Sequence, residues 1–167
     1  MTENGFHLAQ VNIARMLAPL EDDLMYGFVS KLDEINKLAD ESPGFVWRLQ
    51  TEEGNATYLR PYDDERIIVN MSVWESIEHL KQFVYRTQHA SVMRQRAEWF
   101  SKFEGAFIAL WWIPVGHIPT VNEAKERLEY LRTHGESPYA FSFKKTHSAS
   151  EAIQFNTSTL TAAVQCK

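Results

Sequence analysis

Three segments of the chain alternate apolar and polar side chains with a period of two residues, and this pattern restricts the fold more than any other feature. In Arg66–Trp74 it sends two sets of side chains to opposite sides: Val69, Met71 and Val73 against Asn70, Ser72 and Trp74. Phe6–Ala14 and Gly44–Thr51 show the same alternation. Half-buried strands of this kind are typical of an antiparallel sheet with one oily and one semi-polar face.

Two more segments are predicted to be strands, which brings the expected number to five. They are Gly105–Ile113 and the short Tyr139–Phe143. A further stretch, Ala56–Leu59, follows the turn sequence EEGN and could extend a hairpin.

Three stretches have the apolar spacing of amphipathic helices. The first is Asp23–Asp40, which a Pro-Gly pair brings to an end. The second, Ser76–Phe103, is so long that we expect a bend near Arg86–Gln88. The third runs from Thr120 to Gly135 and begins with a capping box, Thr120 with Glu123.

The predicted order is β-α-β-β-α-β, followed by an extra helix and strand, which is the ferredoxin-like α+β arrangement. One domain accounts for residues 1–143, and the Ser/Thr-rich segment 144–167 is predicted to be a flexible polar tail. Helices cover one face of such a sheet and leave the other bare. We therefore expect a second copy of the chain to bury the bare face, which makes the protein a homodimer.

Charge and composition exclude several classes of partner. The formal net charge of the 167 residues is -5, and a nucleic-acid or anionic-membrane surface needs clustered Lys and Arg. No segment has the ~20 uninterrupted apolar residues of a membrane span, and no secretory signal is visible. With Cys166 as its single cysteine, the chain cannot form an intramolecular disulfide, so a cytoplasmic location is expected.

The helix after the third strand carries the leading candidate residues. At helical spacing one stripe gathers Tyr85, His89, Val92, Arg96, Trp99 and Phe103. A guanidinium on this apolar side needs a partner, because burying an unpaired charge is costly. In one interpretation Arg96 pairs with Asp33 or Glu104 while His89 binds a backbone carbonyl. In the other, both line a pocket, with His89 as acid or base and Arg96 as anion anchor.

The strands supply further candidate ligand-binding residues. Those on semi-polar strand faces or close to a strand end are Asn12, Arg48, Asn70, Trp74, Trp112 and His117. The polar faces could meet across a dimer interface, face solvent or line a ligand cavity. The nucleotide, zinc-protease and serine-hydrolase motifs GxGxxG, GxxxxGK[ST], HExxH and GxSxG are absent, and the histidines lack ligand spacing, so no metal ligand is predicted.

Several motifs together resemble the bacterial domain-of-unknown-function family 3291. They are PGFVWRL (43–49), NMSVWES (70–76), LKQFVYRTQH (80–89), RAEWF (96–100), LWWIPVGHIPT (110–120) and AFSF (140–143). The resemblance covers nearly the whole chain, to about Phe143. That family is similar to the dimeric α/β-barrel superfamily of antibiotic-biosynthesis and haem-degrading monooxygenases, polyketide cyclases and muconolactone isomerases.

The resemblance implies which residues would act. The superfamily pattern falls on Gly44-Phe45, Val73-Trp74-Glu75-Ser76 and His89, and the asparagine, tryptophan and histidine of haem-degrading members fall on Asn12, Phe83 and His89. Phe83 replaces that tryptophan, so no cofactor is predicted, although His89 could still ligate a haem iron.

The resemblance also implies a small-molecule enzyme, similar to cofactor-independent monooxygenases, that acts on an aromatic or polyketide-like substrate. His89 would deprotonate the substrate and Asn12 or Arg96 would hold the oxyanion, while Trp74, Tyr85 and Trp112 exclude water. Three alternatives stay open. They are a cyclase or isomerase, a dimer that only binds haem or a hydrophobic ligand, and a scaffolding dimer whose interface pairs involve Arg48, Asn70 and Arg96.

Overall fold

The computed structural model describes residues 5–52, 54–55, 57 and 59–165, with side chains up to residue 159. Within these residues five strands form one antiparallel sheet: β1 (Phe6–Met16), β2 (Phe45–Arg48), β3 (Ile67–Trp74), β4 (Phe100–Ser101) and β5 (Ile108–Pro114). The long strand β1 lies in the middle, with β3 on one side and both β5 and β4 on the other. Strand β2 pairs with β3 at the edge. The predicted ferredoxin-like α+β fold is confirmed.

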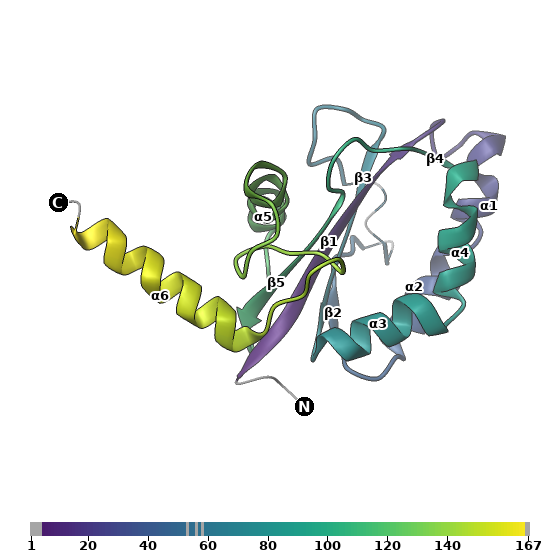
Figure 1. The fold of residues 1–167 in the computed structure, drawn as a ribbon. Helices are drawn as coiled ribbons and strands as arrows, with labels where there is room; N and C mark the ends of the chain where they lie inside the picture. The colour runs from purple at the N-terminus through teal and green to yellow at the C-terminus, as the bar shows by residue number, and fades with distance from the viewer. Residues whose placement is uncertain (1–4, 53, 56, 58, 166–167) are drawn as a thin grey trace.

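The helices lie on both sides of this sheet (Figure 1). In chain order they are the 3-10 helix η1 (Asp23–Met25), α1 (Tyr26–Val29), α2 (Leu32–Asp40), α3 (Ile77–Arg86), α4 (His89–Gln95), the 3-10 helix η2 (Arg96–Glu98), α5 (Val121–His134) and α6 (Ala149–Gln165). Helices α1–α4 cover one face, and α5 lies against the other. No helix in the described part of the chain combines the length and the hydropathy that a membrane span needs.

Helix α5 covers the sheet face that we expected to be bare. Its buried side chains Ala124, Leu128 and Leu131 pack against the oily sides of the strands in one core cluster. From β1 and β3 this cluster contains Ala9, Val11, Ile13, Val69, Met71 and Val73, each at most 5% exposed. The reason for predicting a second copy on this face is therefore wrong, because the extra helix of the same chain already buries it. The homodimer itself stays a prediction.

The two long helices predicted before and after β3 are each interrupted. Asp23–Asp40 divides into η1, α1 and α2, and the Ser30 hydroxyl at the end of α1 donates to the carbonyl of Gly27. The predicted bend near Arg86–Gln88 is present. Thr87 is extended, with φ -116° and ψ -178°, and its hydroxyl donates to the Phe83 carbonyl and accepts from the His89 N–H.

Two predicted segment boundaries are wrong. The helix expected to reach Phe103 ends at η2, because Phe100–Ser101 pairs with Arg15 and Met16 of β1 as strand β4. Tyr139–Phe143 is not a strand, since only Phe141 is bridged to Leu110 of β5. The predicted hairpin extension Ala56–Leu59 includes positions 56 and 58, which lie outside the described residues.

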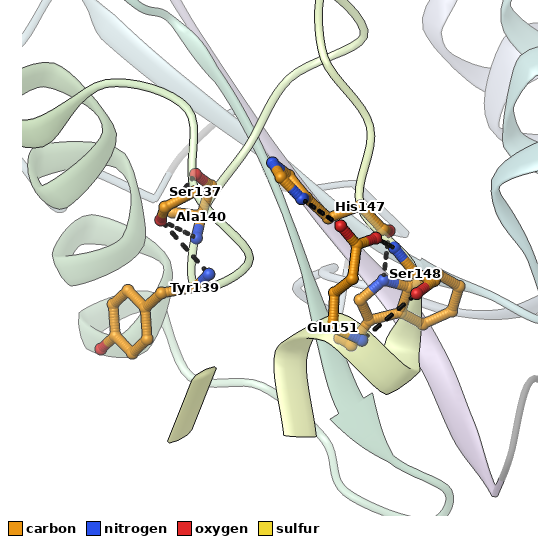
Figure 2. Close-up of polar contacts among 7 residues, drawn as sticks. Ser137, Tyr139, Ala140, His147, Ser148 and Glu151 are labelled. Carbon is orange, nitrogen blue, oxygen red and sulfur yellow. Dashed lines mark hydrogen bonds and ion pairs between the residues drawn. The ribbon is translucent and has the colours of Figure 1, made fainter. Parts of the chain in front are cut away.

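The segment after residue 143 contains the helix α6, where the composition predicts a polar tail. Ser148 and Glu151 form a capping box at its start, shown in Figure 2, with the Ser148 N–H donating to Glu151 Oε2 at 2.7 Å and the Glu151 N–H to Ser148 Oγ at 3.2 Å. Ala149 and Ala152 are buried against the body. The C-terminal part of α6 points away from the rest of the molecule (Figure 1). The domain boundary at residue 143 stays a prediction.

Candidate functional site

Four polar side chains lie in the middle of the sheet face that α2, α3 and α4 cover. Gln10 is paired with Ser72 and Asn12 with Asn70 in the register of β1 and β3. We call these four residues the polar belt. Gln10 and Ser72 are buried, at 8% and 7% exposed, and buried polar groups of this kind need hydrogen bonds, whereas Asn70 is exposed.

The polar belt separates two apolar clusters on this face. The Trp74 cluster consists of Leu8, Ala39, Trp74, Ile77, Leu80, Phe83, Leu110, Trp112, Phe141, Ala149 and Ala152. The Trp99 cluster consists of Ala14, Met16, Ala18, Leu20, Met25, Ile68 and Trp99. Between them lies a cavity of about 190 Å³, lined by the polar belt, by residues of both clusters and by His89, Met93 and Arg96. The site is therefore a hollow between a polar patch of the sheet and the helix layer.

His89 lies at the start of α4 and reaches the cavity wall from the helix side. Its ring packs on Phe83, with centroids 4.9 Å apart, and Phe83 in turn stacks on Trp74 at 5.1 Å. Burial lowers the pKa of His89 below 6.5, although a hydrogen bond to the Val84 carbonyl opposes this shift. A carbonyl oxygen only accepts, so the contact of 3.4 Å places the hydrogen on Nδ1. Nε2 then keeps its lone pair.

Arg96 begins the 3-10 helix η2 and lines the same cavity. Its guanidinium lies over the ring of Phe107, 4.6 Å from the centroid, and burial lowers its pKa. Among the described residues neither Asp33 nor Glu104, nor any other carboxylate, forms an ion pair with it. Half-buried and without a carboxylate, this guanidinium can receive an anionic group of a ligand.

The polar belt is joined by hydrogen bonds that leave donors unused. Gln10 Nε2 donates to Asn70 Oδ1 at 2.7 Å and to Ser72 Oγ at 2.9 Å. The Trp74 indole N–H also donates to Ser72 Oγ, at 2.9 Å. No hydrogen bond holds the side-chain amide of Asn12 within the described residues. Among the described residues, no hydrogen bond uses the side-chain amide hydrogens of Asn12 or Asn70, and both side chains line the cavity.

Arg48 lines the cavity, but its charge is already balanced. Its guanidinium donates to both carboxylate oxygens of Asp40, at 2.7 and 3.2 Å, and to the Gly54 carbonyl at 2.6 Å. Arg48 therefore shapes the wall, and nothing in these contacts leaves it free for a ligand.

Three predicted ligand-binding residues lie away from the cavity lining. Tyr85 is 59% exposed, and its ring packs against the edge of the Phe143 ring, with centroids 5.7 Å apart. Trp112 is buried in the Trp74 cluster and donates to the His147 carbonyl at 2.8 Å. His117 Nε2 lies 2.8 Å from Glu123 Oε2. Burial would raise the pKa of Glu123, but hydrogen bonds from His117 and Trp111 outweigh it and lower that pKa.

Gln10 and Ser72 are site residues that the sequence did not single out as candidates. Gln10 and Ser72 lie two residues from Asn12 and Asn70, so the period-two pattern that selected the asparagines also indicates them. Phe83, which the resemblance places where haem-degrading members have a tryptophan, also lines the cavity.

The charged residues of the cavity wall are all cationic. Among the described lining residues are Lys31, Arg48 and Arg96, and there is no aspartate or glutamate. Lys31 donates to Gln95 Oε1 and lies 5.2 Å from the centroid of the Trp99 ring. In a chain of net charge -5, this arrangement favours an anionic ligand.

The described lining residues form no ordinary metal site, and the cavity is small for haem. No group of three His, Cys, Asp or Glu side chains close enough to hold a metal occurs in the described ranges. A cavity of about 190 Å³ is smaller than the roughly 300–1,000 Å³ of pockets for drug-sized ligands, and haem is a large macrocycle. The haem alternative is therefore not supported by the volume around His89.

Comparisons with known proteins give one family and several distant structures. No curated protein matches the sequence. SnoaB, a cofactor-independent oxygenase from Streptomyces nogalater, is 12% identical over 67% of this chain and 95% of its own, with a TM-score of 0.45. Rv0793 from Mycobacterium tuberculosis is 12% identical over 69% and 98%, with a TM-score of 0.46. A protein of unknown function from Nitrosomonas europaea, NE2512, is 10% identical over 70% and 95%, at 0.43.

At this level of similarity none of these structures assigns a role to a residue of this chain. The family model described as Domain of unknown function (DUF3291) matches residues 7–157, which includes every strand, α1–α5 and the start of α6. The chain therefore belongs to the DUF3291 family.

Proposed function

We propose that this protein is an enzyme that removes a proton from a small aromatic or polyketide-like molecule, with His89 as the base. One observation carries the proposal: a neutral imidazole and a guanidinium without a carboxylate partner line the same small cavity. A cavity that served only packing would have no reason to leave a cation without a counterion.

His89 has the properties of a general base near neutral pH. Because burial lowers its pKa below 6.5, the ring is uncharged at pH 7 and Nε2 can accept a proton. The Nδ1 hydrogen, held by the Val84 carbonyl, fixes the tautomer that this role needs. The Phe83 and Trp74 rings beside it form an apolar wall suited to a flat substrate.

Arg96 and Asn12 would stabilise the negative charge that the proton leaves behind. When a proton leaves a carbon next to a carbonyl group, the charge moves to the oxygen as an enolate. A guanidinium and an amide N–H are donors that bind such an oxygen more strongly than its neutral precursor. The absence of carboxylates from the described lining keeps the enolate from being repelled.

The enolate has two fates that begin with the same proton transfer. In a monooxygenase, the enolate carbon forms a bond to dioxygen and the peroxide takes up the proton. The O–O bond then breaks as the second hydrogen leaves that carbon, so a CH2 group becomes a carbonyl and the other oxygen atom leaves as water. In a cyclase or isomerase, the enolate attacks or rearranges within the substrate. The oxygenation is the version we propose, and oxygen uptake measured with an electrode separates the two.

Exchange of carbon-bound hydrogen for deuterium tests the proton transfer directly. We expect the protein to accelerate exchange at the acidic carbon of β-tetralone in deuterated buffer, followed by proton NMR. The His89→Gln variant should lower the rate about 100-fold, in the range of a lost general base. The control is His134→Gln, which changes an exposed histidine on α5. Circular dichroism checks that both variants are folded.

The pH dependence gives a second readout of the same base. Because the neutral form of His89 is the active one and its pKa is lowered, the rate should fall with decreasing pH at a midpoint below 6.5. Binding of β-tetralone without any exchange would instead make the protein a ligand-binding module. A rate unchanged in His89→Gln would remove His89 from the mechanism.

A further inference from the structure

The hydrogen bonds around Ser72 leave its hydroxyl hydrogen without an acceptor in the described structure. Ser72 Oγ accepts from the Trp74 indole and from Gln10 Nε2, both at 2.9 Å. An indole N–H only donates, and a hydroxyl oxygen has two lone pairs, so both are occupied. The hydroxyl hydrogen of Ser72 is then left over, and the side chain lines the cavity.

Because Ser72 is buried, leaving its hydroxyl hydrogen without an acceptor costs free energy unless a ligand accepts a hydrogen bond from it. Ser72 is 7% exposed and Gln10 is 8% exposed, so bulk water has little access to either side chain. A polar hydrogen in such a place has no role in packing, and an unmade hydrogen bond costs about 1–3 kcal/mol. Trp74 and Gln10 hold the Ser72 oxygen from two directions, which fixes where its hydrogen can point.

Ser72 lies on the opposite wall of the cavity from His89 and Arg96, whereas Asn12 belongs to the same sheet as Ser72. His89 and Arg96 belong to the helix layer, whereas Ser72 belongs to β3 in the sheet. A ligand between the layers can therefore be held by oxygen at both of its ends. The Phe83 ring, which stacks on Trp74, gives one side of the cavity an apolar surface for the ligand skeleton.

We propose that Ser72 donates a hydrogen bond to a second oxygen of the ligand, remote from the oxygen bound by Arg96. The ligand class is then a small aromatic or alicyclic molecule with oxygen functions at two separate positions. Gln10 is a positioning residue, because it acts by holding Ser72 and Asn70. This inference rests on the proposed function, whose substrate it specifies further.

The test compares ligands with one and two oxygens. Calorimetric titration gives the dissociation constants of β-tetralone and of its phenolic derivatives, with the hydroxyl at each ring position in turn. We expect the best derivative to bind wild-type protein about tenfold more tightly than β-tetralone, the value of one good hydrogen bond. In Ser72→Ala this preference should fall to twofold or less. The control, Ser158→Ala on the exposed part of α6, should keep the preference.

Each other result overturns the assignment. If no derivative binds better than β-tetralone, or if Ser72→Ala keeps the preference, Ser72 does not contact the ligand. Exchange that still depends on His89 would then leave the proposed proton transfer standing. If none of these compounds binds, the ligand class is wrong. Should Ser72→Ala fail to fold, Ser72→Cys, which keeps the shape but donates weakly, replaces it with the same expected loss of preference.

Discussion

Arg48 and Arg96 both line the cavity, but the fold balances only one of their charges. Arg48 binds Asp40 through two hydrogen bonds and also holds the Gly54 carbonyl. Arg96 has the face of Phe107 and no carboxylate within the described residues. An arginine retained for stability would be expected to have a carboxylate partner, as Arg48 has. Comparing variants of the two arginines therefore separates a structural role from a ligand-binding role.

Replacing each arginine by methionine should therefore have opposite consequences. Arg48→Met loses hydrogen bonds to a charged partner and should lower the free energy of unfolding by about 1–3 kcal/mol. Arg96→Met removes a half-buried charge along with a cation–π contact worth about 0.5–1 kcal/mol, so stability should change by less than about 1 kcal/mol. Chemical denaturation measures both.

The rate of hydrogen–deuterium exchange in β-tetralone should rank the two variants in the reverse order. Arg96→Met should slow the exchange about 100-fold, as expected when a donor to a developing oxyanion is lost, while Arg48→Met keeps most of the rate. A large loss of stability in Arg96→Met with normal exchange would make Arg96 a structural residue.

At the scale of elements, the break between α3 and α4 determines which side chains reach the cavity. A continuous helix would place Tyr85 and His89 on one stripe, as the sequence predicts. The extended Thr87 instead turns α4, so that His89, Val92, Met93 and Arg96 line the cavity and Tyr85 stays exposed. Thr87 holds this geometry through its hydroxyl, which bonds the end of one helix to the start of the next.

Thr87→Val should weaken both the fold and the site. Removing a capping hydroxyl costs about 1 kcal/mol, and His89 loses the contact that fixes its backbone, so β-tetralone exchange should slow as well. Thr120→Val is the matched control, because Thr120 caps α5 through the Glu123 N–H at 3.1 Å. We expect it to lose similar stability in thermal unfolding with unchanged exchange. Equal exchange rates in the two variants would contradict a positioning role for Thr87.

Four of the five predicted strands correspond to β1, β2, β3 and β5, whereas Tyr139–Phe143 is not a strand and β4 lies in a segment predicted to be helical. Sequence patterns also placed His89, Arg96, Asn12, Asn70, Arg48 and Trp74 in segments that the fold brings to one cavity. Tyr85, Trp112 and His117 could not be excluded, since their positions depend on a helix break and on contacts with His147 and Glu123. Their functional roles, like those of the other six, stay predictions.

Helix α6 was missed although a local signal for it exists. The segment is rich in Ser and Thr, which have low helix propensity, and this composition suggested a tail. Ser148 and Glu151, however, have the spacing of a capping box, and the bond from the Ser148 N–H, followed by that from His147, lowers the pKa of Glu151. A local cap can therefore identify a helix whose composition argues against it.

At the scale of the whole molecule, both faces of the sheet are covered by the chain itself. Helix α5 occupies the face through which a second copy was expected to pair. A homodimer, which the family resemblance implies, must then use another surface or displace α5. The candidate cavity does not need the partner to be closed on the sheet side, because the polar belt and both clusters belong to one chain.

The division of the helix-covered sheet face into the Trp74 cluster and the Trp99 cluster has a consequence for how a ligand enters the cavity. Helix α4 contributes no buried residue, whereas α3 buries Ile77, Leu80 and Phe83 in the Trp74 cluster. Unequal anchoring means that neighbouring segments open at different free energies. Amide hydrogens of α4 should therefore exchange with solvent faster than those of α3, as mass spectrometry of deuterated peptides can measure. Entry of a ligand into the cavity would then require only a brief opening of α4, while the rest of the protein stays folded.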